Sequence, residues 1–361
     1  MAGRDWNSVP YLPILALSPA EMRGLEELPN RDKNLLLPYV HLRPWVGAHT
    51  LDKALDRVKK AYGERPYIAD IAPAEPGEET KPREVFAELR ALRDSKGGYA
   101  NWCEFITAQE NLIPVVQLRD ITQLKAQIER LYDLGRGLAV HIRPQMMSVL
   151  PTLVGAIAAE TSGGKNVCFV IDLAKQSQSL LLAEAHTVGT INSVRTAAPN
   201  GHIAVSASSF PEGFTSIEKQ DIFERQHFNG VVAILGPAKL IYSDRGSARA
   251  EKQMGGGGTP APRIDYAGDS RWDFFRAEPV KKEDRPAAYV AQAKLAYKHS
   301  CFDKKLQVWG CQMIERASKG DLTAIHSPAL STAARINIHL HQQLFHGDSS
   351  GLYETDEDWD D

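Results

Sequence analysis

One nine-residue stretch constrains the fold of this chain more than any other. The run from Asn166 to Ala174 is apolar on both alternating faces and rich in β-branched and aromatic residues. Such a run predicts a strand that is buried on both sides, as in a parallel sheet covered by helices. Its one charged residue, Asp172, lies near the C-terminal end, where α/β folds build their sites. A carboxylate is costly to bury without partners, so Asp172 either faces a wet cleft or is paired.

The same design, an apolar strand that ends in a polar residue and leads into a helix, repeats along the chain. We predict eight strands, which begin near residues 35, 66, 112, 138, 166, 202, 240 and 263. Alternating strands and helices in this number favour an α/β fold of the (β/α)8 type, similar to a TIM barrel.

The expected domain organisation follows from these elements. Residues 1–346 are expected to form one domain, with the barrel strands and helices in 35–276 and a C-terminal helical segment in 280–346. The apolar run Tyr11–Leu17 is expected to be an N-terminal segment that covers one end of the sheet. Residues 347–361 form an acidic tail that we expect to be disordered.

Charge and cysteine content limit the class of protein. The net charge of -3 argues against a non-specific nucleic-acid binder. The four cysteines lack CxxC spacing, which predicts reduced thiols and a cytoplasmic protein. No window approaches the roughly 18 consecutive apolar residues of a membrane span, and no signal peptide is expected.

Polar residues where the strands end are the candidate functional residues. In a barrel these side chains converge on one rim and form a charged cup. Arginines there suit bidentate capture of phosphate or carboxylate, and carboxylates suit acid–base chemistry or divalent metals. We predict catalytic roles for Asp70, Arg143, Asp172 and Asp244. We predict substrate-binding roles for His41, Arg43, Arg119, His141, Ser208, Arg263 and Tyr266. The competing interpretation is that the acids and arginines pair with each other and only close the end of the barrel.

Other motifs carry less information. His339 and His341 have the spacing of a metal site on a strand, but their rings diverge on a helix. We therefore assign no metal, and the sequence leaves the cofactor unknown. The turn at 162–165 lacks the first glycine of a phosphate-binding loop. The four glycines at 255–258 are expected to form a mobile loop that acts as a lid over the rim.

The order of short motifs along the chain resembles the phage beta protein family, which also occurs in bacterial genomes. The matching motifs lie within residues 11–345 and include YLPIL (11–15), LPYVH (37–41), YIAD (67–70), IPVV (113–116), IDL (171–173), SSFP (208–211), YSDRG (242–246), IDY (264–266) and RINIH (335–339). The family commonly has an acid at the position of His41 and an Asp-Tyr pair at 244–245. The resemblance implies a barrel-like α/β fold and a phage or anti-phage defence setting, and it assigns no biochemical activity.

Two classes of function remain open. The first is an enzyme or ligand sensor that acts on a phosphorylated small molecule or nucleotide at the rim. The second is a non-catalytic interaction or scaffold subunit of a defence complex, with a protein partner encoded nearby. Neither class involves a membrane, and the net charge does not indicate nucleic acid. The fold alone does not decide between them.

Overall fold

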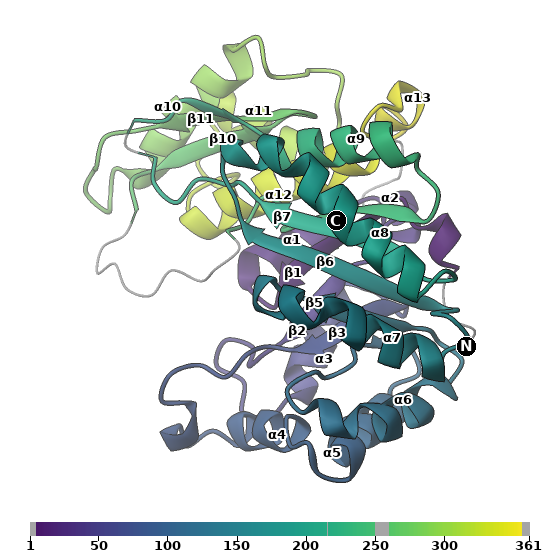
Figure 1. Ribbon diagram of the computed structural model, residues 1–361. Coiled ribbons are helices and arrows are strands. Elements are labelled where there is room, and N and C mark those ends of the chain that lie inside the picture. Colours follow the sequence, from purple (N-terminus) through teal and green to yellow (C-terminus); the bar gives the residue numbers. More distant parts are fainter. Residues whose placement is uncertain (1–4, 215, 250–259, 356–361) are drawn as a thin grey trace. The chain divides into compact units, whose positions relative to one another are not determined.

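The computed structural model describes residues 5–214, 216–249 and 260–355 (Figure 1). The chain divides into two compact units. The barrel unit comprises Met1–Leu17, Leu36–Ala207 and Phe223–Asp244, and the second unit comprises Ser18–Leu35, Ser208–Ile222 and Arg245–Asp361. The glycine loop at 255–258 and the end of the acidic tail, 356–361, lie outside the described residues.

The sheet of the barrel unit is parallel and nearly closed into a barrel. Its strands are β1 (Tyr11–Ala16), β2 (Tyr39–Leu42), β3 (Tyr67–Ile71), β4 (Leu112–Pro114), β5 (Leu138–Ile142), β6 (Val167–Lys175), β7 (His202–Ser208) and β9 (Leu240–Asp244). They are ordered β4-β3-β2-β1-β9-β7-β6-β5. A parallel bridge between Val115, which follows β4, and Ala139 of β5 links the two edges. The predicted (β/α)8 barrel-like fold is therefore confirmed.

Helices follow the strands and flank them (Figure 1). They are α3 (Asp52–Tyr62), α4 (Glu84–Leu92), α5 (Lys96–Ala108), α6 (Leu124–Tyr132), α7 (Leu150–Glu160), α8 (Glu184–Ala197) and α9 (Phe223–Leu235). In α3, Ala54, Val58 and Ala61 lie on the buried face, and Gly63 ends the helix at a φ of 73°. Among the described residues, no helix has both the length and the apolar character that a bilayer-spanning segment needs.

Two strand assignments differ from the prediction. The segment Tyr11–Leu17, expected to cover the barrel, supplies β1, which pairs in parallel with β2 and β9. Its run is buried on both alternating faces, which is the environment of a central parallel strand. Arg263–Tyr266, expected as the eighth barrel strand, instead begins an antiparallel hairpin in the second unit. The connection at 268–270 is too short for a parallel crossover, so only antiparallel pairing is open to it.

The second unit packs helices around a three-stranded antiparallel sheet of order β10-β11-β8. Its strands are β8 (Lys219–Asp221), β10 (Arg263–Ala267) and β11 (Arg271–Arg276). Its helices are α1 (Pro19–Glu26), α2 (Asn30–Leu35), α10 (Arg285–Lys298), α11 (Trp309–Ser318), α12 (Pro328–Leu344) and α13 (Ser349–Leu352). Its apolar core includes Trp272, Tyr289 and Ile338. The tail at 347–361, which was expected to be disordered, contains the short helix α13.

The segment that carries His339 and His341 is the buried helix α12. Because it is helical, its two histidines contact different groups. The ring of His339 stacks on Trp272 at 5.8 Å between centroids. His341 Nδ1 lies 2.6 Å from Asp32 Oδ2, and both of these side chains are fully buried. The two rings therefore have separate packing roles.

Candidate functional site

The interior of the barrel is apolar at its centre and polar toward the C-terminal ends of the strands. One buried cluster takes residues from all eight barrel strands, so it lies inside the barrel; it includes Ile68, Ala139 and Val170. Residues two apart on a strand share a face. The next inward positions on the same three strands are Asp70, His141 and Asp172. Strand periodicity therefore brings three ionisable side chains to one end of the barrel.

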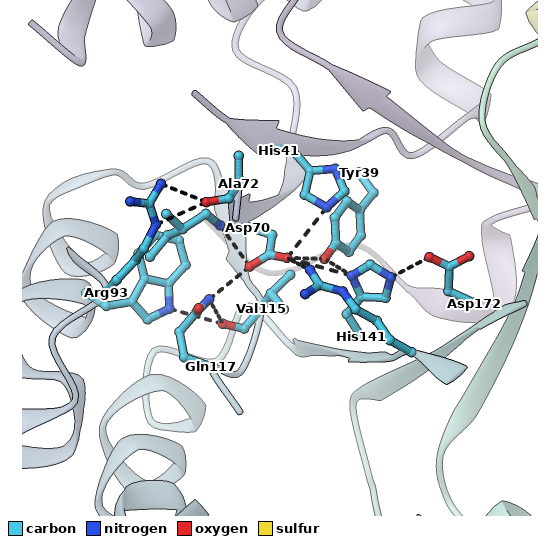
Figure 2. A network of polar contacts seen from close by, with 12 residues as sticks. Tyr39, His41, Asp70, Ala72, Arg93, Val115, Gln117, His141 and Asp172 are labelled. Carbon is cyan, nitrogen blue, oxygen red and sulfur yellow. Dashed lines mark hydrogen bonds and ion pairs between the residues drawn. The ribbon is translucent and has the colours of Figure 1, made fainter. Parts of the chain in front are cut away.

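These side chains form a continuous hydrogen-bonded chain with Tyr39 of β2 (Figure 2). The Tyr39 hydroxyl donates to Asp70 Oδ2 at 2.6 Å and lies 3.0 Å from His141 Nδ1. On the other side of the ring, His141 Nε2 lies 2.9 Å from Asp172 Oδ2. All four residues are less than a tenth exposed. We call this the Asp70–Tyr39–His141–Asp172 chain.

The hydrogen-bonding capacities of these groups limit how the contacts can be made. A phenol has one proton, and Tyr39 donates it to Asp70, so the Tyr39 oxygen faces His141 Nδ1 as an acceptor. An ionised Asp172 only accepts, so it pairs with an N–H at His141 Nε2. The ring of His141 thus lies between two buried carboxyl groups. Each carboxylate therefore has a cation or a donor at hydrogen-bond distance, which makes the burial of the charges tolerable.

Asp70 has several contacts besides the one with the Tyr39 hydroxyl. Its Oδ1 accepts from Gln117 Nε2 at 2.9 Å and from the backbone N–H of Ile71 at 2.8 Å. Its Oδ2 lies 3.7 Å from both His41 Nε2 and Arg143 Nη2. Burial by itself would raise the pKa of Asp70, but the contacts with His141, His41 and Arg143 outweigh it and hold that pKa well below its usual range. The carboxylate is therefore charged at neutral pH.

The low pKa of Asp70 predicts an acid-dependent loss of stability. Because the folded-state pKa lies below the unfolded value of about 3.9, the ionised group stabilises the fold above that pH. This contribution is lost as the pH falls through the folded-state pKa. We expect Asp70→Asn to flatten the dependence of the unfolding free energy on pH below about 4. Urea titrations at several pH values measure it, and parallel profiles for the two proteins would contradict the assignment.

Asp172 is anchored by an unusual backbone conformation. The N–H of Ala174 donates to Asp172 Oδ1 at 2.9 Å. Ala174 has a φ of 57°, in the left-handed region that residues with a side chain avoid at a cost of about 1–2 kcal/mol. The strained residue Ala174 lies two positions after Asp172, and its conformation points its N–H at the Asp172 carboxylate. One oxygen of Asp172 is thus held by the main chain and the other contacts His141.

Two arginines and a histidine lie on the side of the Asp70–Tyr39–His141–Asp172 chain that is nearer to solvent. Arg143 directly follows β5, and its side chain is 34% exposed. Arg43 follows β2 and pairs with Glu75 at 3.3 Å. His41 is less exposed, and its ring packs edge-on against Tyr39 at 5.1 Å between centroids. The structure therefore brings together five of the predicted residues, with Arg43 at the edge: Asp70, Arg143, Asp172, His41 and His141.

The remaining predicted residues lie elsewhere. Arg119 is exposed and lines a separate cavity of about 500 Å³ with Arg90 and Arg93. Three residues belong to the second unit and are engaged there. Ser208 donates to the carbonyl of Ala248, Arg263 pairs with Asp265, and the Tyr266 hydroxyl accepts from the backbone N–H of Asp303.

Asp244 lies on the opposite face of its strand from the barrel interior. Ile241 belongs to the interior cluster, so alternation turns Tyr242 and Asp244 outward. Asp244 accepts from the Tyr11 hydroxyl at 2.6 Å and from the Tyr242 hydroxyl at 2.8 Å. The guanidinium of Arg225, on α9, lies 3.2 Å from the Tyr242 ring centroid. Asp244 is thus not brought together with Asp70, Arg143 and Asp172.

Sequence reasoning missed Tyr39 and the role of Gln117 as a donor to Asp70. Attention to the last polar residue of each strand pointed to His41 and passed over Tyr39. The signal was present, because Tyr39 lies two positions before His41 and shares its face. A tyrosine in an otherwise aliphatic barrel interior needs a partner for its hydroxyl, which would have pointed to the neighbouring carboxylate.

The fold and this network define the class of protein, a parallel α/β barrel with a buried acid–tyrosine–imidazole chain at the C-terminal strand ends. The chain belongs to the Beta protein family, whose model matches residues 11–345. It is similar to Protein beta of Enterobacteria phage P4, with 30% identity over 346 residues, or 92% of each chain. No solved structure matches it. The family predicted from the sequence motifs is confirmed.

Proposed function

We propose that this barrel binds a phosphorylated small molecule or nucleotide at the C-terminal strand ends and acts on it by acid–base chemistry. The observation that carries this function is the ring of His141 between two buried carboxyl groups, 2.9 Å from Asp172 and linked through Tyr39 to Asp70. Positioned imidazole and carboxyl groups at the C-terminal strand ends are the groups that acid–base catalysis uses. The similarity to a phage protein supports a role in a phage or anti-phage defence system.

An anionic ligand is supported by the state of Arg143. Among the described residues its guanidinium makes one ion-pair contact, 3.7 Å from Asp70 Oδ2, which is too long for a hydrogen bond. A guanidinium has five N–H donors in a planar fork that matches two phosphate oxygens. Arg143 therefore offers a charged, partly exposed donor set beside His141, where a phosphate group can bind.

Two interior serines also support a polar ligand or ordered water in the barrel. Ser206 of β7 and Ser243 of β9 are paired in the strand register, and both are fully buried. Neither hydroxyl has a hydrogen-bond partner within the described part of the chain. Buried polar groups are nearly always satisfied, so a ligand or water is expected to complete them.

Arg143→Ala separates ligand binding from folding. Because Arg143 is partly exposed and only loosely paired, we expect a stability loss of about 0–1 kcal/mol. Loss of a charge-assisted hydrogen bond worth about 1.5–3 kcal/mol should weaken binding of the phosphorylated ligand roughly 10- to 150-fold. Mass spectrometry of ligands retained on purification identifies the compound, and calorimetry then measures its affinity.

Arg130→Ala is the matched control, since Arg130 is an exposed arginine on α6. It should leave both stability and binding unchanged. A large fall in melting temperature for Arg143→Ala would instead assign Arg143 to closing the end of the barrel. Unchanged affinity in a well-folded Arg143→Ala protein would remove Arg143 from the ligand site.

A second candidate function, a non-catalytic interaction subunit, is favoured by one observation. Four apolar side chains that follow barrel strands are each more than half exposed: Val46, Ile121, Val149 and Leu182. They lie in the connections after β2, β4, β5 and β6, and Ile121, Val149 and Leu182 lie in short 3-10 helices there. These connections are at the same end of a parallel barrel. Exposed apolar residues gathered at one end are typical of a protein-binding surface. Under this function, Leu182→Ser lowers association with the partner, and Arg143→Ala does not.

A further inference from the structure

We propose that His41, Asp70 and His141 bind a divalent transition-metal ion, with Asp172 as the group that orients His141. The metal site rests on the proposed function, because both use the C-terminal strand ends of the barrel. It adds a cofactor to that function. The metal ligands come from the ends of β2, β3 and β5. No metal was assigned from the sequence, in which these three residues are about 30 and 70 positions apart and share no local motif.

The donor atoms are close enough to share one ion. His41 Nε2 and His141 Nδ1 each lie 3.7 Å from Asp70 Oδ2, and all three atoms lie within 4.8 Å of one another. In a tetrahedral site with metal–ligand distances of about 2.0–2.1 Å, donor atoms are about 3.4 Å apart. Small side-chain shifts are therefore enough to form the site. Two imidazoles and one carboxylate are a donor set that suits Zn²⁺ or Fe²⁺ and leaves positions for water or substrate.

Asp172 supplies an independent indication of a metal. Histidines that bind metals usually donate their other N–H to a carboxylate, which fixes the orientation of the ring. His141 contacts Asp172 through Nε2 at 2.9 Å and keeps Nδ1 directed at the Tyr39–Asp70 side. Asp172 is itself held by the N–H of Ala174. Asp172 is thus fixed by a backbone amide and contacts Nε2, the ring nitrogen of His141 that would not bind the metal. Carboxylates in metal sites commonly hold a ligand histidine in this way.

The Tyr39 hydroxyl lies among the candidate donor atoms. Its oxygen is 2.6 Å from Asp70 Oδ2 and 3.0 Å from His141 Nδ1. A metal ion binds the lone pair of a ring nitrogen that carries no hydrogen, so a metal at Nδ1 leaves the hydrogen of the ring at Nε2. That Nε2–H then donates to Asp172.

The charge balance connects the metal with an anionic ligand. Asp70 and Asp172 carry two negative charges, and once His141 is neutral a divalent ion balances them. The positive charge of Arg143, which lies 3.7 Å from Asp70, then has no negative charge to balance it within the site. A phosphate group is attracted to this net positive charge. Arg143 also repels the metal itself. Replacing it with alanine is thus expected to tighten metal binding while it weakens binding of the phosphorylated ligand.

The test is a titration of the metal-free protein with Co²⁺ alone, followed by visible absorption and calorimetry, with no phosphorylated ligand present. We expect one Co²⁺ per chain. Asp172→Asn should weaken affinity about 10- to 100-fold, as loss of an orienting partner does. His41→Ala, at the most exposed of the three ligands, should weaken it by more than tenfold and is expected to fold. The exposed His186→Ala on α8 is the matched control and should bind as the wild type does.

Two results would overturn the metal site. The first is Co²⁺ affinity that is the same in wild type and in His41→Ala, with circular dichroism showing both to be folded. The second is binding that depends on Cys301, because Asp273, His299 and Cys301 of the second unit form another group able to hold a cation. A thiolate-to-cobalt charge-transfer band that disappears in Cys301→Ser would assign the ion to that group.

The metal site and the proposed function can fail separately. Co²⁺ binding that needs His41, in a protein that retains no phosphorylated ligand, upholds the metal and rejects the ligand class. If a phosphorylated ligand binds equally well with and without chelator and no Co²⁺ binds, the ligand class is upheld and the metal site is rejected. Arg143→Ala should shift the two affinities in opposite directions, and a parallel shift would contradict the metal site.

Discussion

Asp265→Ala is expected to destabilise the second unit by about 3–5 kcal/mol, because it leaves a buried arginine without its counter-charge. Arg335 Nη1 donates to Asp265 Oδ2 at 2.6 Å, and Arg263 donates to both carboxylate oxygens. Asp265 and Arg335 are 2% and 4% exposed. Burial lowers the pKa of Arg335 to about 10, and Asp265 opposes that shift. An arginine side chain stays protonated in proteins, so the guanidinium is expected to remain charged at neutral pH after Asp265 is removed.

Denaturant unfolding of the variant measures this loss. The matched control is Asp284→Ala, an exposed aspartate in the same unit whose side chain does not cap α10, expected to change stability by less than about 0.5 kcal/mol. The double variant Asp265→Leu with Arg335→Met should recover most of the loss, because it removes the buried arginine together with its partner. Arg263 also loses Asp265, but its side chain is 21% exposed and keeps contact with solvent. Wild-type stability in Asp265→Ala would mean that solvent reaches Arg335 and that the pair contributes little.

Asp244→Ala is expected to cost the barrel unit about 2–6 kcal/mol, since two buried hydroxyls lose their acceptor at about 1–3 kcal/mol each. Tyr11 and Tyr242 are 0% and 2% exposed, and both donate to Asp244. Burial, followed by the charge of Asp244, raises the pKa of each tyrosine well above its ordinary value. The hydroxyls therefore stay protonated and need an acceptor.

Calorimetric or urea unfolding measures this second loss, with the exposed Asp56→Ala on α3 as the control. Asp244→Asn should cost less, because its amide oxygen still accepts one hydrogen bond. Below its unfolding transition, Asp244→Ala should bind the phosphorylated ligand with wild-type affinity, because its side chain faces away from the barrel interior. Loss of ligand binding in the folded variant would return Asp244 to the site where the sequence first placed it.

These two variants and Arg143→Ala test the alternatives that the sequence left open. Acids and arginines where strands end either pair for stability or form a site. Asp265 and Arg335 are a buried pair, and Asp244 is held by tyrosines. Asp70, His141 and Asp172 are also buried, but Arg143 and His41 connect them to solvent. The same pattern of residues thus has a structural use in one place and a proposed chemical use in another.

The strands and the class of fold could be predicted from local sequence because their signal is local. The run at 166–174 needs burial on both faces whatever surrounds it, and only a parallel sheet covered by helices provides that. The inward position of Asp172 follows from its spacing to Val170, since residues two apart share a face. His141 follows in the same way from Ala139. The charged end of the barrel was therefore visible before any tertiary contact was known.

The membership of the barrel and the contents of the site were decided by contacts between distant residues. Tyr11–Ala16 reads as a short apolar run that could cover a sheet, and only its pairing with β2 and β9 makes it a strand of the barrel. The hydrogen bond from Tyr39 to Asp70 and the approach of His141 to Asp172 each join residues 31 positions apart. The alternation of side chains is a property of each strand alone, whereas register and closure depend on its neighbours. The sequence by itself thus determined which side chains each strand turns inward, and the tertiary structure decided which of them meet.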